Sequence, residues 1–512
     1  MKLPPGRLAP TAALLITALV SAMDVTIVAT VMPTIVGELG GLALYSWVIA
    51  GYLLTSTTTV PIYGRLADLR GRKPLFLVAM SVFLFGSVLC ALAPRMELLI
   101  VARAVQGLGA GGLMTLVATL AGDLFPGEDR PKIQGLISTV WGLAAIVGPL
   151  AGSLIVSHAS WRWVFWINLP VGLLAAGVLA VTVHERVERH RQTIDYAGAA
   201  LLTLGVGALL LGLVEGGQRG FGAATVWAWF GASATLLAAL AWVEARAPAP
   251  VVPYTLLRRR LLGLASVAAA TLGACVISTS TYLPLLVQGA QGGTPQEVAW
   301  VTGAVSLAWT FGSIGVGRAL GRCGYRGAAL GGMALLSGGG VALALLGLAT
   351  PLPLVVGAGA IVGLGMGVTW TTLIVMVQSA VDWAQRGAVT ATLQFFQSIG
   401  GTLWVSVQGA VLSAAISAGL HAAGAGPESG ADIVGRGPAA LNAMLDPATR
   451  AAMPPDEAQL LADVLVGGLH QVFLLYLGAA LLGLLVVALL PSPASQAASE
   501  RRGVADQGAR QP

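Results

Sequence analysis

Two ionisable residues, Asp24 and Arg103, interrupt long apolar runs in this chain of 512 residues. A charge at the centre of a membrane costs about 2.5–3.5 kcal/mol, so such groups pair with one another or line a polar cavity. Burial also favours the neutral form of a carboxyl group, which would let Asp24 bind and release a proton. Two structural alternatives stay open. Asp24 could cap a helix break before Pro33, and Arg103 could donate hydrogen bonds to backbone carbonyls of neighbouring helices.

The residues for other kinds of chemistry are missing or scattered. Five histidines are scattered over different loops and spans and only three cysteines occur, so the sequence predicts no metal site and no converging catalytic groups. The G-x-x-x-x-G-K-[ST] motif of nucleotide-driven pumps does not occur. We therefore expect a protein that is not an enzyme and that uses neither a metal nor a cofactor. Three cysteines also predict no disulfide framework.

The elements that position Asp24 and Arg103 are predicted to be membrane-spanning helices. Hydrophobic residues form 56% of the chain and charged residues only 10%, whereas soluble domains carry about 25% charged residues. The apolar runs are continuous and reach the roughly 20 residues that cross the hydrocarbon core, which favours helices over a membrane barrel. The predicted fold class is an all-α polytopic membrane protein with fourteen transmembrane helices, at approximately 10–32, 46–64, 74–94, 98–121, 133–157, 163–183, 196–215, 223–243, 262–288, 298–317, 326–349, 352–378, 387–417 and 464–490.

Basic residues orient these predicted spans. With fourteen spans, 22 of the 28 Lys and Arg residues fall on one side of the membrane and five on the other, while Arg103 lies inside a span. By the positive-inside rule the basic side is cytoplasmic, and both termini lie there. The N-terminal apolar run is interpreted as an uncleaved first span, because no small-residue cleavage site follows it. The net charge of +6 therefore reflects membrane orientation and does not indicate nucleic-acid binding.

The two halves of the chain repeat each other. The glycines of the run Gly107-x-Gly-x-Gly recur 256 residues later, and the segment 64–73 recurs 253 residues later at 317–326. Matching loops on one side of the membrane indicate a parallel repeat about an axis along the membrane normal. The predicted domains are a six-helix bundle at 1–183, two extra helices with cytoplasmic linkers at 184–260, a second six-helix bundle at 261–491 with an external loop at about 418–463, and a disordered cytoplasmic tail at 492–512.

Several motifs resemble those of the major facilitator superfamily. The sequence GRLADLRGRK at 64–73 is similar to the G-x-L-A-D-R-x-G-R-K loop of that family, with the middle basic residue one position late. The sequence RAVQG at 103–107 resembles the family's span 4 motif. Residues 144–153 resemble the span 5 antiporter motif, with Ala and Ser in place of two glycines. The segments 24–28 and 161–170 are similar to signatures of the fourteen-span drug:proton antiporter branch.

This resemblance implies a major facilitator fold with two six-helix bundles and two extra central helices. It implies a role in proton coupling or cation binding for Asp24 and Arg103. It also implies a gate at the cytoplasmic side, in which Asp68 meets a second-bundle helix and Arg72 can pair with Asp123. An acid at a helix N-terminus gains about 0.3–1 kcal/mol from the helix dipole. The gating set is Gly64, Asp68, Gly71, Arg72 and Asp123. If the charges of this set served only to orient the chain in the membrane, the basic residues would be explained but Asp68 would not.

Spans 2, 5, 9 and 13 supply the remaining candidate residues. Ala144, Gly148 and Gly152 are four residues apart, so they share a helix face that permits close backbone approach, and Pro149 bends the helix. A large apolar cavity with few polar groups suits lipophilic ligands. Candidates for its lining, each of which could instead serve packing, are Thr55, Trp141, Tyr282, Gln394, Phe395, Phe396, Gln397 and Trp404.

The favoured function is a secondary transporter that exports lipophilic neutral or monovalent cationic compounds, driven by the proton gradient. The expected partners are a small-molecule substrate, protons and membrane lipid, with no nucleic acid, and the protein is expected to work as a monomer in the cell's inner (cytoplasmic) membrane. Export of a specific metabolite, lipid or amino acid on the same fold is the alternative. A non-transporting membrane sensor is a more distant one. The shortage of intramembrane acids predicts one proton per cycle, which disfavours divalent substrates.

Overall fold

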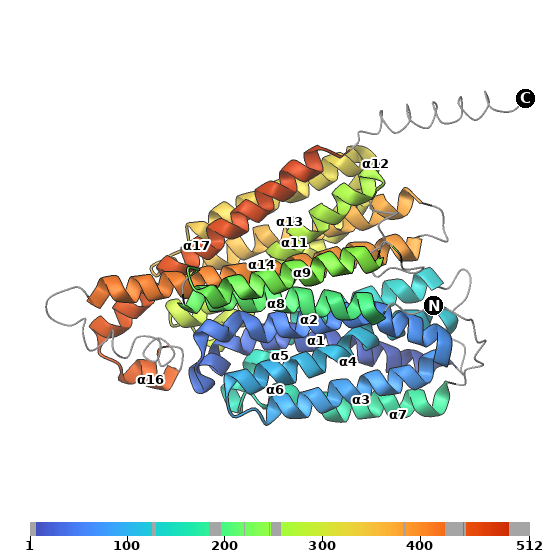
Figure 1. The fold of residues 1–512 in the computed structure, drawn as a ribbon, viewed down its shortest axis with the longest axis horizontal. Coiled ribbons are helices and arrows are strands. Elements are labelled where there is room, and N and C mark those ends of the chain that lie inside the picture. The colour runs from blue at the N-terminus through green and yellow to red at the C-terminus, as the bar shows by residue number, and fades with distance from the viewer. Residues whose placement is uncertain are drawn as a thin grey trace, which may run out of the picture.

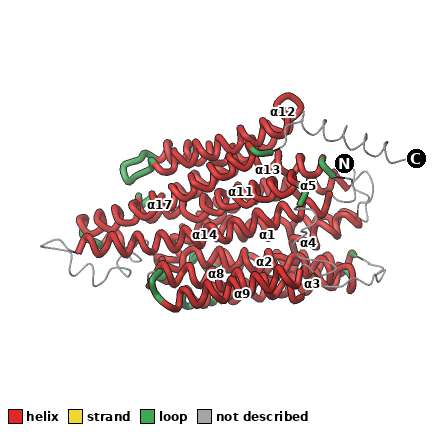
Figure 2. The backbone as a smooth tube through the Cα atoms, turned by 45° about the horizontal axis from the view of Figure 1, so that its top comes forward, coloured by secondary structure: helices red, strands yellow, loops and turns green. Residues whose placement is uncertain are grey.

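The computed structural model describes residues 7–124, 130–183, 196–219, 221–244, 246, 258–381, 386–424, 444 and 447–490. These residues are almost entirely helical, and the connections that the structure describes in full are short (Figures 1 and 2). Three predicted segments lie wholly or largely outside the described residues. They are the tail at 492–512, the two linkers of the extra helices, and the external loop. The prediction of an all-α fold is confirmed.

The helices follow the predicted order of spans. The first half contains α1 (Leu8–Leu39), the short 3-10 turn η2 (Leu42–Leu44), α2 (Tyr45–Arg70), α3 (Arg72–Ala91), α4 (Met96–Leu124), α5 (Arg130–His158) and α6 (Trp163–Trp166) with α7 (Asn168–Thr182). The two extra helices are α8 (Tyr196–Arg219) and α9 (Ala224–Glu244). The second half contains α11 (Arg260–Pro284) continued by the π-helix η4 (Leu285–Ala290), α12 (Pro295–Ala344), α13 (Leu352–Ser379), α14 (Arg386–Gly424), α16 (Pro447–Ala452) and α17 (Pro455–Ala488).

Each predicted span is occupied by a helix, and α12 contains two spans divided at Gly324, where the backbone is not helical. By length and hydropathy, 11 of the described helical segments could cross a membrane. Helices α2, α5 and α8 are not among these segments, and each contains side chains that lie outside the described residues. The total of fourteen crossings therefore stays a prediction.

Two predicted loops are shorter than the sequence suggested. The segment 64–73 was expected to be a loop, but α2 continues to Arg70 and α3 begins at Arg72. Leu, Ala and Arg are good helix formers, so the helix continues through this polar segment until Gly71, whose φ of 92° permits a sharp turn. The external loop predicted at 418–463 is also shorter, because α14 extends to Gly424 and α17 begins at Pro455.

Glycines set equivalent helix contacts in both bundles. A Cβ atom on Gly107 of α4 would overlap the carbonyl oxygen of Tyr52 in α2, and one on Gly363 of α13 would overlap that of Val305 in α12. The glycines are 256 residues apart and their partners 253, so the sequence repeat is also a repeat of backbone contacts. The same relation holds between Gly109–Phe83 and Gly365–Leu336, and between Gly111–Ser56 and Gly367–Trp309.

The two bundles meet along α1 with α11, α2 with α14, and α5 with α12. Helices α8 and α9 pack together, and α8 lies against α2 and α14, so the extra pair covers one side of the junction between the bundles (Figure 1). At the predicted external end, the Tyr45 hydroxyl donates to the Thr281 carbonyl at 2.6 Å, and the Gln288 amide donates to the Thr34 hydroxyl at 2.8 Å. These bonds join the bundles at that end.

Helix α16 is docked on the end of η4. The Arg450 guanidinium donates to the carbonyls of Gly289 at 2.6 Å and Ala290 at 3.0 Å. Burial lowers the pKa of Arg450 from its ordinary value, although the group remains a cation near neutral pH. A cation favours the carbonyl end of a helix, so Arg450 anchors part of the predicted external loop on the second bundle.

Candidate functional site

Asp24 and Arg103 form an ion pair inside the first bundle. Arg103 Nη1 lies 2.6 Å from Asp24 Oδ2, and the two side chains are 2% and 0% exposed, respectively. Asp24 comes from the middle of α1 and Arg103 from α4. Another ion pair, Arg162 with Glu38, lies at the predicted external end and is partly exposed. The first bundle therefore holds a fully desolvated pair of opposite charges.

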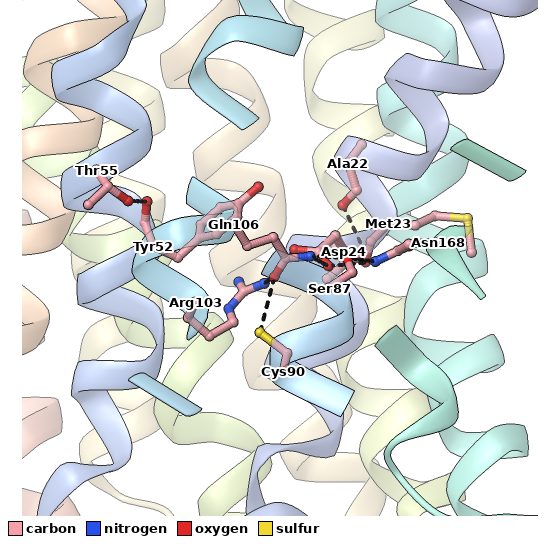
Figure 3. A network of polar contacts seen from close by, with 11 residues as sticks. Ala22, Met23, Asp24, Tyr52, Thr55, Ser87, Cys90, Arg103, Gln106 and Asn168 are labelled. Atoms are coloured by element: carbon pink, nitrogen blue, oxygen red, sulfur yellow. Dashed lines mark hydrogen bonds and ion pairs between the residues drawn. The ribbon is translucent and has the colours of Figure 1, made fainter. Parts of the chain in front are cut away.

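Amide and hydroxyl groups surround this pair (Figure 3). Gln106 Nε2 donates to Asp24 Oδ1 at 2.8 Å, and Asn168 Nδ2 donates to the same oxygen at 3.1 Å. Both amides also donate to the Ser87 hydroxyl oxygen, at 2.7 and 3.1 Å. Gln106 Oε1 in turn accepts from Arg103 Nη1 at 2.6 Å. Four helices, α1, α3, α4 and α7, thus contribute to one buried polar network.

The ring of Tyr52 covers the guanidinium of Arg103, whose Cζ lies 4.0 Å from the ring centroid. This contact adds a cation–π attraction, which is strongest where water is excluded. The Tyr52 hydroxyl and Arg103 Nε are buried, and neither has a hydrogen-bond partner in the part of the chain that the structure describes. The Arg103 guanidinium therefore has spare donor capacity next to an uncommitted hydroxyl.

Two glycines let the helices approach closely enough for these contacts. A Cβ atom on Gly86 of α3 would collide with the backbone of Gln106 in α4, and one on Gly107 would collide with the backbone of Tyr52. Because α2 and α3 both lie directly on α4, short side chains such as Ser87 reach the residues of α4. Small residues have this packing role in membrane helices generally.

The predicted gating residues lie where α2, α3 and α4 end. Gly64 and Asp68 belong to the last turns of α2, so Asp68 is at the C-terminal end of its own helix, and Gly71 forms the turn to α3. Arg72 begins α3, and Asp123 is next to the last residue of α4. The side chains of Asp68 and Asp123 lie outside the described residues, and the predicted contacts of both stay predictions.

The span 5 motif packs α5 against α1. The Ala144 carbonyl accepts from the Thr26 hydroxyl at 3.3 Å, and a Cβ atom on Gly148 would overlap that hydroxyl. A Cβ on Gly152 would lie 3.2 Å from Val31. Pro149 lies inside α5, in the same stretch. The motif therefore brings α5 against the helix that carries Asp24.

The predicted cavity residues are dispersed, and two of them pack inside the bundles. Tyr282 is fully buried, donates to the Val405 carbonyl at 3.0 Å and stacks on Tyr45 at a centroid distance of 6.3 Å. Thr55 lies under Gly107, between α2 and α4. The other described candidates are on α14, where Gln394 is exposed and the following four are half-buried: Phe395, Phe396, Gln397 and Trp404. The side chain of Trp141 lies outside the described residues.

Sequence reasoning missed most of the network around Asp24. Gln106 is one helical turn after Arg103 in the same motif, and Asn168 lies in the motif at 161–170, so both had a signal that was not used. Ser87 and Tyr52 had none, because nothing local distinguishes them from other polar residues of apolar helices. Proximity across four helices is a tertiary property.

Comparison with known proteins decides the family. The family model described as Major Facilitator Superfamily matches residues 14–405. The chain belongs to the major facilitator superfamily. Multidrug transporter protein MdtP of Bacillus subtilis (strain 168) is 36% identical over 414 residues, which cover 78% of this chain and 75% of that protein. Multidrug resistance protein 3 of the same strain is 31% identical over 478 residues, 91% of each chain.

Solved structures support the same fold. A bacterial homologue of the human lysosomal transporter Spinster, in an inward-facing and occupied conformation, matches with a TM-score of 0.68. The match covers 96% of this chain and 97% of that one, at 14% sequence identity. The prediction of a major facilitator membrane transporter is confirmed by the family match and the fold together.

Proposed function

We propose that this major facilitator protein is a proton-coupled multidrug exporter that works by alternating access. The buried Asp24–Arg103 pair carries the proposal. A buried ion pair is a weak source of stability, because desolvation offsets much of its attraction. Its presence in a membrane bundle is better explained by a task in which Asp24 changes its charge. The relatives named for multidrug transport favour efflux of diverse compounds as that task.

The charges of the site favour neutral or monovalent substrates. Among the described residues of the first bundle's interior, Asp24 is the one carboxylate, and Arg103 already balances its charge. A monovalent cation would have to replace Arg103 as the partner of Asp24, and a divalent cation would lack a second carboxylate. A neutral lipophilic compound needs no such partner.

The proton gradient can drive such export with one proton per cycle. A membrane potential of about 100 mV supplies about 2.3 kcal/mol per charge moved, and one pH unit supplies about 1.4 kcal/mol. Exchange of one proton for a neutral compound uses both contributions, about 3.7 kcal/mol, which supports a gradient of several hundred-fold. Exchange for a monovalent cation leaves about tenfold. No bound cofactor is needed.

Contacts at the two ends of the molecule are proposed to stabilise its two access states. The bonds of Tyr45 and Gln288 between the bundles support a state closed at the external side. We further propose that Asp68, Arg72 and Asp123 form the gate of the opposite, cytoplasmic side. The basic residues that the positive-inside rule assigns to the cytoplasm set the proposed orientation of the monomer in the inner membrane. In this orientation both termini are cytoplasmic.

Transport in inverted membrane vesicles tests the proton coupling. With an imposed pH gradient, wild-type vesicles should accumulate neutral and monovalent lipophilic compounds but not divalent cations. Asp24→Asn should abolish this coupled uptake, because the amide cannot release a proton. The matched control is Glu215→Gln, which alters a carboxylate bonded to Trp229 on the extra helices and should retain uptake. Coupled uptake that persists in Asp24→Asn would contradict the proposal, as would strong transport of divalent cations.

Native and introduced cysteines test the orientation. Cys323 is exposed beside Gly324 at the predicted cytoplasmic end, whereas Cys90 and Cys275 are buried. A membrane-impermeant maleimide should label the wild-type protein only after the cells are permeabilised, and Gly222→Cys should be labelled in intact cells. Labelling of Cys323 in intact cells would reverse the assigned orientation.

A further inference from the structure

The two carboxylate oxygens of Asp24 have different partners. Oδ1 accepts from two neutral amides, those of Gln106 and Asn168, whereas Oδ2 accepts from the charged Arg103. Each oxygen of a carboxylate has about two lone-pair positions for hydrogen bonds. The amides fill both positions on Oδ1. On Oδ2, Arg103 fills one, and no other donor reaches it among the described residues.

The orientation of the two amides is fixed by their other bonds. Gln106 Oε1 accepts from Arg103 and from the Cys90 thiol, at 2.6 and 3.6 Å, so its Nε2 must point toward Asp24 and Ser87. Asn168 Nδ2 likewise donates to Ser87. Amide nitrogens only donate hydrogen bonds, and therefore neither can accept a proton carried by Oδ1.

We propose that Asn168 is a positioning residue that, together with Gln106, closes Oδ1 to protons, so that a proton binds the open position of Oδ2 and competes with Arg103 for the negative charge there. This inference rests on the proposed proton coupling and adds the atom and the residue that direct it. A proton bound to Oδ1 would take one of its two filled positions and displace an amide hydrogen bond. A proton bound to Oδ2 leaves both intact, because Oδ1 then becomes a carbonyl oxygen that still accepts from them.

The consequence is a change of partner for the charge at Oδ2. When a proton bonds to the open position of Oδ2, the carboxyl group becomes neutral, and the hydrogen bond from Arg103 Nη1 weakens enough for Arg103 to move away. Arg103 keeps Oε1 of Gln106 and the ring of Tyr52 as partners. When the proton leaves, Arg103 returns to Oδ2. Protonation on α1 is thereby linked to the position of a side chain on α4.

Few other titratable groups can influence this exchange. Electrostatic interactions of Asp24 involve Arg103 from α4, Tyr52 from α2 and Cys90 from α3. Tyrosine and cysteine are ordinarily neutral near pH 7. Helices α5, α7 and α11, which also pack against α1, bring no titratable side chain to Asp24 among their described residues. The competition is therefore between one proton and one guanidinium.

Infrared difference spectroscopy of the purified protein in liposomes tests the inference without transport. The carboxyl C=O band that appears on acidification and is absent in Asp24→Asn belongs to Asp24. In Asn168→Leu, which keeps the size of the side chain but removes its donor, the pH midpoint of this band should rise by about one pH unit. A hydrogen bond to the charged form favours that form, and one pH unit is a tenfold change in proton affinity.

Two further variants separate positioning from general packing. Asn168→Ser keeps a donor of shorter reach and should shift the midpoint upward by less than Asn168→Leu. Gln408→Leu removes a buried amide from the second bundle, where Gln408 bonds to Ser278, and should leave the midpoint unchanged. An unchanged or lowered midpoint in Asn168→Leu and Asn168→Ser would overturn the inference, even with coupling abolished in Asp24→Asn. Persistent coupling in Asp24→Asn would instead overturn the proposed function.

Discussion

In the first bundle, Asp24 of α1 is bonded to Arg103 of α4, and both side chains are buried. The second bundle has Cys275 in α11 and Gly359 in α13 at the corresponding positions, 251 and 256 residues later. Neither of these carries a charge near pH 7 in its ordinary state. The helix contacts around the two sites are nevertheless equivalent. Equivalent packing is therefore reached without an ion pair in the second bundle, and the proposed proton coupling would account for the pair in the first.

In the part of the second bundle that the structure describes, the fully buried polar side chains are neutral. Gly340 stands where the first bundle has Ser87, and the ring of Tyr476 occupies the space beside it. Gln408 accepts from Ser278 at 2.5 Å and donates to a backbone carbonyl of α17. Among the described residues, the fully buried polar side chains of this bundle do not change charge at physiological pH.

The predicted cytoplasmic turns differ in the same way. Tyr325 stands at the place of Arg72, and Ser379 at the place of Asp123, by the offsets of 253 and 256 residues. The Tyr325 and Ser379 hydroxyl oxygens are 3.1 Å apart. The ends of α12 and α13 are thus close enough for a contact of the kind predicted between Arg72 and Asp123. The second bundle makes this contact with neutral groups.

The largest effect is expected when the ion pair is broken. Arg103→Leu leaves Asp24 buried without its cation, which should cost about 3–5 kcal/mol of stability when Asp24 is ionised. Thermal denaturation in detergent should show a larger loss at pH 8 than at pH 5, because protonation removes the unpaired charge. Gly359→Ala is the matched change in the second bundle and should stay within about 1 kcal/mol of the wild type. Equal losses would show that the comparison is wrong.

The next effect concerns the gate. Asp68→Asn should leave the protein in the membrane but lower transport by about tenfold, through a bias of about 1.4 kcal/mol between access states. Tyr325→Phe removes only one exposed hydrogen bond and should change transport by less than about threefold. Initial rates of uptake in vesicles with matched protein amounts measure both. A wild-type transport rate in Asp68→Asn would show that the segment 64–73 serves only to orient the chain in the membrane.

A smaller effect should separate packing from coupling. Gly107→Ala and Gly363→Ala each force a helix backbone apart, at a cost of about 1–3 kcal/mol. The two losses in thermal stability should be similar, since the contacts are equivalent. Only Gly107→Ala displaces Tyr52 from Arg103, so only this variant should also lose proton-coupled uptake beyond its loss of folded protein. Similar transport in the two variants would count against a role for Tyr52.

The smallest effect is expected at two basic residues that begin equivalent helices. Lys73 donates to the Val183 carbonyl at 2.8 Å after α7, and Arg326 donates to the Ala488 carbonyl at 2.6 Å at the end of α17. Each cation stabilises the carbonyl end of a helix, so Lys73→Met and Arg326→Met should each cost about 0.3–1 kcal/mol. Thermal denaturation should show similar, small decreases, with Lys73→Arg close to the wild type.

The sequence predicts the helices well because hydrophobicity, and not tertiary contact, determines which segments enter a membrane. It also predicts the repeat, since glycines such as Gly107 and Gly363 are required where backbones touch. The end of α2 was missed, because polarity was taken as a sign of a loop although the residues up to Arg70 favour a helix.

The site was only partly predictable. Asp24 and Arg103 were identified from the cost of burying charge, but their pairing depends on how α1 and α4 pack. Tyr282 was proposed as a cavity residue from its type and span, whereas its hydroxyl bonds to Val405 in the interior. Residue type does not reveal which face of an apolar helix meets another helix, since lipid and protein interior are equally apolar.

Proton release on substrate binding tests most directly whether the first bundle alone couples protons. Purified wild-type protein in weakly buffered detergent, with a pH-sensitive dye, should release about one proton for each bound molecule of a transported neutral compound, because one buried carboxyl group gives up its proton. Gln408→Leu should release the same amount, and Asp24→Asn none while still binding substrate. Equal proton release from Asp24→Asn and the wild type would contradict the account.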